Sequence, residues 1–182
     1  MLKDIDGLKI IKEENLNDLF KSAFLRDISE SCKILSTDFF LDSFNYFPIT
    51  KQNETFNNLF KRQDYNSIDH FYTKDFYNNL IDKKNNFKLI KDSFILGSSP
   101  SDNYFSNLIH FLPRIFFIDA KKTNLVINRN LSNKFRQFIE TICSLRDVDI
   151  SFTFLDDNFY NFENSSIPEF FNINKSIKIL KF

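Results

Sequence analysis

The chain has 182 residues, of which 42% are hydrophobic and 26% charged, and its 24 basic and 24 acidic side chains give zero net charge. This balance is typical of a globular domain and excludes an intrinsically disordered chain. Because no overall field favours nucleic acid or anionic lipid, we expect no nucleic-acid partner and at most peripheral contact with a membrane. The two glycines exclude a P-loop or a GxGxxG turn, since both need several glycines where the backbone approaches phosphate.

Apolar spacing predicts helices in the first part of the chain. In residues 13–30, leucine, phenylalanine and isoleucine recur at helical spacing behind two glutamates that suit the positive end of a helix dipole. The aromatic segment 35–50 is broken by a proline and is predicted to be a packed loop. Shorter helices are predicted near 53–62 and 74–82. We therefore expect residues 1–84 to form a helical and loop-rich N-terminal region, in which no motif indicates a function.

The remainder of the chain predicts alternating strands and helices. "FKLIKDSFILGSS" (87–99) has the pattern of two short strands around a Lys-Asp turn. An apolar helix (103–118), a strand "NLVIN", an amphipathic helix "LSNKFRQFIETICSL" with Ser132 as its cap, and an alternating strand "ISFTFLDD" follow. This order is the βαβ signature of a parallel sheet with helices on its faces, so residues 85–182 are expected to form a Rossmann-like α/β region.

The predicted helix 103–118 is apolar around most of its circumference but carries one polar stripe. At about 100° per residue, its hydrogen-bonding side chains fall in line. These are Asn103, Asn107, His110 and Arg114, with Ser106 at the edge. An arginine and a histidine at mid-bilayer are unfavourable, which predicts a buried helix of a soluble protein instead of a membrane span.

Pro113 interrupts the same helix. Proline lacks a backbone N–H, so it frees the carbonyl four residues earlier, that of Ile109, and favours a kink beside His110 and Arg114. Two interpretations of the stripe stay open. A polar ligand satisfies it, or it belongs to a kinked core helix in which Arg114 pairs with a nearby carboxylate.

The segment "ILGSSPSDNYFSNLIHFLPRIFFI" (95–118) resembles the signature of the glycosyltransferase 61 family, which includes bacterial transferases of the capsular-polysaccharide type. The residues that match in type and spacing are Asn103, Tyr104, Phe105, Leu112, Pro113 and Arg114. The resemblance covers roughly residues 85–160. Where the family has a histidine this chain has Ser106, and where the family has an acidic residue it has His110.

The resemblance implies the N-terminal, acceptor-side half of a GT-B-type transferase. Such an enzyme passes a hexosyl or pentosyl group from a nucleotide sugar to a glycan acceptor in surface or capsular polysaccharide synthesis. The candidate substrate-binding residues are then Asn103, Ser106, Asn107 and Arg114. His110 is the candidate catalytic base, since its pKa lies near neutrality. We expect no metal and no cofactor bound by this chain. The nucleotide-sugar donor would be a co-substrate held by a second domain or polypeptide.

Two other functions stay open. The chain is either a truncated or inactive half that binds glycan without its donor domain, or an α/β scaffold without a catalytic role. The two cysteines, Cys32 and Cys143, form no CxxC motif and are predicted to be buried thiols in a reducing compartment. The first residues lack the continuous apolar stretch of a signal peptide, so a cytoplasmic location is expected.

Overall fold

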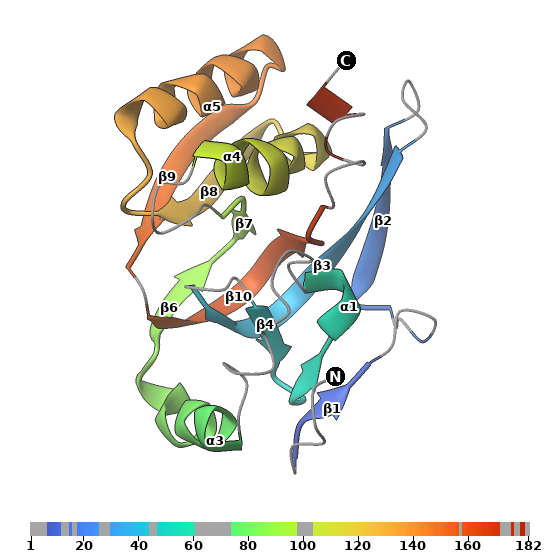
Figure 1. Cartoon of the computed structure of the whole chain (residues 1–182), viewed down its shortest axis with the longest axis vertical. Helices are drawn as coiled ribbons and strands as arrows, with labels where there is room; N and C mark the ends of the chain where they lie inside the picture. Colours follow the sequence, from blue (N-terminus) through green and yellow to red (C-terminus); the bar gives the residue numbers. More distant parts are fainter. Residues whose placement is uncertain are drawn as a thin grey trace.

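Figure 1 shows the computed structural model, which describes residues 7–11, 15, 18–25, 30–43, 47–60, 74–97, 104–156, 158–171, 176 and 179–180. These residues form a mixed α/β fold. Its strands are β1 (Lys9–Ile10), β2 (Phe20–Leu25), β3 (Glu30–Asp42), β4 (Phe47–Thr50), β5 (Glu54–Thr55), β6 (Lys88–Lys91), β7 (Ser93–Ile95), β8 (Lys122–Asn128), β9 (Asp149–Leu155) and β10 (Phe159–Pro168). Its helical segments are α1 (Asn57–Phe60), α3 (Lys74–Lys83), η3 (Lys84–Asn86), α4 (Tyr104–Ser106), η4 (Asn107–Phe111), η5 (Leu112–Phe117) and α5 (Asn133–Leu145).

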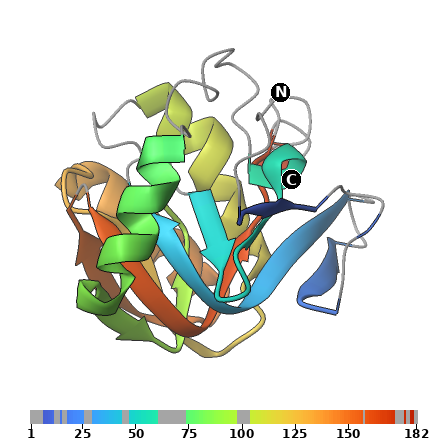
Figure 2. The ribbon, with the colours of Figure 1, turned by 90° about the horizontal axis from the view of Figure 1, so that it is seen from below.

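One eight-stranded mixed sheet organises the molecule. Its order is β2-β3-β10-β7-β8-β9, with β4 paired to β3 and β6 paired to β10. Strands β7, β8 and β9 are parallel, and β10 is parallel to β6 and β7. Strand β3 is antiparallel to its neighbours β2, β4 and β10. The long strands β3 and β10 lie side by side and curve together (Figures 1 and 2), so an early strand and a late strand of the chain pair in the middle of the sheet.

The predicted strand–helix–strand–helix–strand order is confirmed. The contiguous segments α4, η4 and η5, hereafter the composite helix (residues 104–117), connect β7 to β8, and α5 connects β8 to β9. Helix α5 begins as predicted, because the Phe135 amide donates to the Ser132 hydroxyl at 3.4 Å. Residues 156–158 alone lead from β9 to β10, too few for a crossover helix, so the βαβ pattern ends after three parallel strands.

Alternate residues of β7 and β8 face two separate apolar cores. Phe94, Leu125 and Ile127 pack with the composite helix and α5 on one face of the sheet. Ile95 and Val126 pack on the other face with residues of β3, α1 and α3. Burial on both faces explains why these strands are continuous apolar runs in the sequence.

The predictions for the first part of the chain are largely wrong. The helix expected over 13–30 is contradicted by β2, and β3 begins at the end of that range. The loop expected over 35–50 is instead most of β3 together with β4. Pro48 lies in β4, which pairs only with β3 among the described strands, and such an edge strand tolerates the missing N–H.

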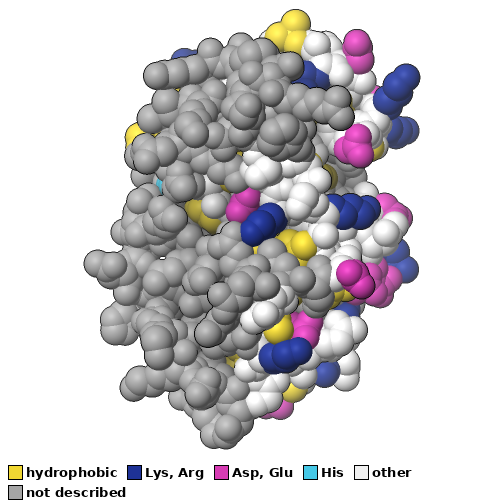
Figure 3. Space-filling model, turned by 90° about the vertical axis from the view of Figure 1, so that its right-hand side faces the viewer, with side chains coloured by type: hydrophobic (Ala, Val, Ile, Leu, Met, Phe, Trp, Pro, Cys, Tyr) yellow, Lys and Arg dark blue, Asp and Glu magenta, His cyan; other side chains and the backbone are white. Residues whose placement is uncertain are grey.

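Further along, the range 53–62, expected to be a helix, holds the short strand β5 followed by the helical turn α1, and its residues 61–62 lie outside the described residues. The helix expected over 74–82 is confirmed as α3. No helix in the described part of the chain is both long and apolar enough to cross a membrane. On the side drawn in Figure 3, basic and acidic side chains are interspersed over the described surface, and neither sign gathers into a patch there.

Candidate functional site

The composite helix changes its winding at the proline that the sequence singles out. Its first turn is α-helical, η4 is a π-helix and η5 is a 3₁₀ helix with Pro113 in its first turn. Because Pro113 has no N–H, the carbonyl of Ile109 lacks its helical donor. That carbonyl accepts a hydrogen bond from the Ser176 hydroxyl. A side chain from near the C-terminus therefore supplies the hydrogen bond that the proline cannot donate.

The polar stripe of this helix is buried. Asn107 and Arg114 are fully buried, and Ser106 and His110 are 6% and 3% exposed. Asn103, the remaining residue of the predicted stripe, lies outside the described residues. The structure thus brings the four described candidates together on one helix, on its inner side.

The stripe forms hydrogen bonds with backbone carbonyls of distant segments. His110 Nδ1 lies 3.0 Å from the Phe171 carbonyl oxygen, so Nδ1 carries the proton of this bond. The Arg114 guanidinium donates to the carbonyls of Leu96 and Glu169 at 3.1 and 3.3 Å. Because Leu96 follows β7 and the other two carbonyls follow β10, these side chains tie the ends of both strands to the composite helix.

Aromatic rings complete the surroundings of Arg114. Its Cζ lies 5.4 Å from the centre of the Phe111 ring and 5.2 Å from that of Phe170. Rings at this distance attract a guanidinium. Carbonyl oxygens and ring faces therefore both contribute to the surroundings of this buried charge.

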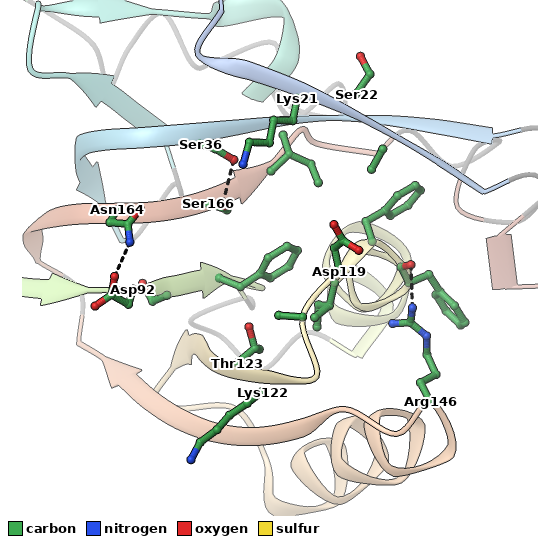
Figure 4. Close-up of a pocket in the computed structure, with 18 residues that line it drawn as sticks. Lys21, Ser22, Ser36, Asp92, Asp119, Lys122, Thr123, Arg146, Asn164 and Ser166 are labelled. Carbon is green, nitrogen blue, oxygen red and sulfur yellow. Dashed lines mark hydrogen bonds between the residues drawn. The ribbon is translucent and has the colours of Figure 1, made fainter.

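A cavity of about 750 Å³, hereafter the central cavity, lies beside the composite helix on the same side of the sheet. Its walls come from β2, β3, β7, β8 and β10, from residues 116–120 and from Arg146 (Figure 4). The composite helix and α5 cover this face over β7 and β8. The central cavity opens over the part of this face that these helices leave uncovered.

Small polar side chains form the floor of the central cavity. Ser36 of β3 pairs with Ser166 of β10, which in turn pairs with Phe94 of β7. The hydroxyl oxygens of Ser36 and Ser166 lie 2.9 Å apart. Serines in a row leave space above the sheet that larger side chains would fill, and their hydroxyls can donate and accept hydrogen bonds.

Two left-handed residues shape one rim of the cavity. Asp92, between β6 and β7, has φ 48°, and Asn164, at an irregularity in β10, has φ 46°. The Asn164 side-chain amide donates to the Asp92 carboxylate, and its backbone amide donates to Asp38 Oδ1 at 2.8 Å. Bulges are common beside binding sites because they redirect side chains. Here the paired irregularities direct a carboxylate and an amide toward the rim.

The opposite rim comes from the segment between the composite helix and β8. The Arg146 guanidinium donates to the carbonyls of Ile115 and Phe116, which fixes the end of η5. Asp119 and Thr123 point toward the cavity in Figure 4, whereas Lys122 points away from it. Ser93 is the first residue of β7, and Thr123 is the second residue of β8. The cavity therefore lies at the amino-terminal side of the parallel strands, opposite to the carboxyl-terminal crevice in which α/β sheets usually bind nucleotides.

A second cavity of about 410 Å³ lies at that carboxyl-terminal side, next to the start of α5. Two large hydrophobic side chains in its lining, those of Tyr104 and Phe138, are exposed to 64% and 44%. The Tyr104 ring meets the Phe135 ring edge to face at 5.8 Å. This cavity is more apolar than the central one.

The described candidates of the polar stripe line neither cavity. Sequence reasoning also missed the residues that do line the central cavity. Ser36 and Ser166 are separated by 130 positions, and a serine within a strand is no local signal of a binding site. Only the register of β3 with β10 brings them together.

No protein-family model matches this chain, and no curated protein and no solved structure is significantly similar to it. The resemblance to the glycosyltransferase 61 family therefore depends on the residues quoted above.

Proposed function

We propose that this chain is a glycan-binding α/β domain whose ligand lies in the central cavity. The observation that carries the proposal is the hydroxyl-lined floor formed by Ser36 and Ser166 inside a hollow of about 750 Å³. That volume falls within the range of small-molecule sites, about 300–1,000 Å³.

The chemistry of the walls suits a polyhydroxylated ligand. Sugar hydroxyls donate and accept hydrogen bonds, and so do the hydroxyls of Ser36, Ser166 and Thr123. The Asp119 carboxylate adds an acceptor on the rim formed by residues 116–120, and the Lys21 ammonium adds donors from β2 (Figure 4). The half-buried ring of Phe116 offers an apolar face, against which the C–H groups of a sugar ring can pack.

Within this proposal the chain has the role of the acceptor-side, Rossmann-like half of a GT-B-type glycosyltransferase. The nucleotide-sugar donor would then be bound by a second domain or polypeptide, and the reaction would belong to cytoplasmic steps of polysaccharide synthesis. The sequence resemblance supports this assignment. Buried thiols at Cys32 and Cys143 suit a reducing compartment. The Nδ1–H of His110 is held by the Phe171 carbonyl, so Nε2 is the nitrogen that could act as a base, but the imidazole is 3% exposed and lines neither cavity. We therefore assign acceptor binding to the cavity and no base to His110.

Binding to an array of neutral and uronate-containing oligosaccharides tests the proposal. We expect the wild-type chain to retain at least one oligosaccharide. Lys21→Ala and Asp119→Ala should weaken its binding by roughly tenfold each, because each removes a charged hydrogen-bonding group from the cavity. Lys88→Ala and Asp82→Ala are matched controls, exposed and outside both cavities, and should bind normally. Absence of any retained glycan, or equal binding by all four variants, would contradict the proposal.

Titration with UDP-sugars and GDP-sugars extends the same experiment to the donor. A glycan-binding half should bind the oligosaccharide and give no saturable response to either nucleotide sugar. Turnover by the isolated chain would instead show that it contains a donor site of its own.

A further inference from the structure

Strand β9 (Asp149–Leu155) forms one edge of the large sheet. Among the strands that the structure describes, β8 is its only partner. An edge strand presents a row of backbone groups that can pair with another strand. The question is which groups β9 presents.

Two backbone hydrogen bonds define the direction of these groups. The Asp149 amide donates to the Lys121 carbonyl at 2.7 Å, and the Leu155 carbonyl accepts from the Arg129 amide at 2.8 Å. In a parallel ladder, alternate residues direct both backbone groups to the same neighbour. The odd-numbered residues of β9 therefore face β8. The residues that direct N–H and C=O away from the sheet are Ile150, Phe152 and Phe154.

Asp149, the first residue of β9, is the only charged residue along this edge. Natural edge strands usually carry lysine, proline or a bulge, and "DISFTFL" contains no lysine, arginine, proline or glycine. Its register with β8 is regular along all seven residues. The opposite edge, β2, carries Lys21 in contrast. The two edges of the sheet therefore differ in their capacity to join another strand.

We propose that two copies of this chain associate through β9, antiparallel about a twofold axis, so that the sheet continues from one copy into the other. In the favoured register Phe152 faces Phe152 of the second copy, and Ile150 faces Phe154. All three outward residues then form hydrogen-bonded pairs, each exchanging two bonds. A shift of one strand by two residues keeps the outward backbone groups facing each other but leaves one of these three residues unpaired. The polar residues Ser151 and Thr153 face each other on the other side of the sheet.

The helix above β9 is compatible with this arrangement. Helix α5 packs over both β8 and β9, through Leu125, Ile127, Ile150 and Phe152. Two such helices, related by the twofold axis, would lie about two strand spacings apart, which is about 10 Å. Helices in contact are typically about 8–10 Å apart.

Charges on the flank of α5 support the same partner. The Arg136 guanidinium lies 4.5 Å from the centre of the Phe154 ring at the edge. Glu140 is exposed one helical turn later on the same flank. An antiparallel pair of α5 helices therefore presents a basic group of each copy to an acidic group of the other.

Sedimentation velocity of the full chain over a wide concentration range tests the association. We expect a concentration-dependent dimer. Phe154→Pro removes an N–H that points away from β8, so it should leave the fold intact and weaken the dimer. Phe154→Ala loses the same ring but keeps the N–H, and is the matched control. The dissociation constant of Phe154→Pro should exceed that of Phe154→Ala by roughly tenfold, while both variants keep the wild-type circular dichroism.

Disulfide formation tests the register. Phe152→Cys should form a covalent dimer under mild oxidation, because residues in a hydrogen-bonded antiparallel pair have Cα atoms about 5.5 Å apart, within reach of a disulfide. Ser151→Cys faces Thr153 of the second copy and should stay uncrosslinked. A wild-type chain that sediments as a monomer at every concentration would overturn the proposal. A dimer that tolerates Phe154→Pro, or that crosslinks through Ser151→Cys instead, would overturn it equally.

Discussion

Replacing Arg114 by methionine tests whether the polar stripe of the composite helix holds the fold together. The guanidinium is fully buried and donates to the carbonyls of Leu96 and Glu169. Methionine fills much of the same volume and donates to neither, so both carbonyls would lose this donor inside the core.

The expected loss follows from these bonds. A hydrogen bond from a charged donor contributes about 1.5–3 kcal/mol, and two are removed. Relief of the burial of the guanidinium itself, which costs several kcal/mol for an ion, offsets part of that loss. We therefore expect the free energy of unfolding to fall by about 2–4 kcal/mol, a large share of the about 5–15 kcal/mol typical of a domain.

Urea unfolding followed by far-ultraviolet circular dichroism measures the difference. The matched control is Arg129→Met, because Arg129 forms an exposed ion pair with Asp156 at 2.9 Å. Exposed pairs contribute about 0–1 kcal/mol, so this control should unfold almost as the wild type does. If Arg114→Met lowered stability no more than Arg129→Met, the structural role assigned to the stripe would be refuted.

Three further outcomes follow from the same contacts. His110→Ala should lower the free energy of unfolding by about 1–3 kcal/mol, and His110→Asn should recover part of it in the same urea assay, because its amide can donate to the Phe171 carbonyl. Ser176→Ala removes the donor to the Ile109 carbonyl and should cost about 1–3 kcal/mol; an unchanged urea midpoint would contradict that bond. Burial raises the pKa of the Cys143 thiol against the opposing effect of Arg146, so the unfolded chain releases this proton at lower pH than the folded one. This contribution to stability is full below the ordinary thiol pKa and declines as pH rises above it, and urea midpoints of Cys143→Ala between neutral pH and about pH 10 should lack that decline.

The βαβ part of the fold could be predicted because its signals are local. Apolar runs bounded by turn residues indicate β7 and β8, and the buried positions Phe135, Ile139 and Cys143 recur at helical spacing behind the cap Ser132. Such signals need no knowledge of distant segments. They identified the strands and helices from residue 87 to residue 155.

Strands β2, β3 and β10 could not be predicted in the same way. Strand β10, "FYNFENSSIP", is rich in polar residues and interrupted at Asn164. It is a central strand only because β3 pairs with one side of it and β6 and β7 with the other. The apolar spacing of β2 fits a helix locally and the aromatic segment of β3 was predicted to be a loop, and strand pairing overrides both local preferences.

The same distinction applies to the site. The sequence placed Ser106, Asn107, His110 and Arg114 on one stripe, and the structure has these four on the inner side of one helix. The carbonyls that His110 and Arg114 contact belong to the backbone, which every residue has, so no sequence pattern could reveal these bonds. The central cavity depends on the pairing of distant strands, and it was therefore absent from the predictions.

The most direct test of the account is a titration of isotopically labelled chain with an oligosaccharide retained on the array, followed by amide chemical shifts. We predict saturable shifts centred on Ser36, Thr123 and Ser166, with the resonances of Asn107 and His110 unchanged. Shifts centred on the composite helix, or on Tyr104 and Phe138 at the second cavity, would contradict the assignment of the central cavity as the glycan site.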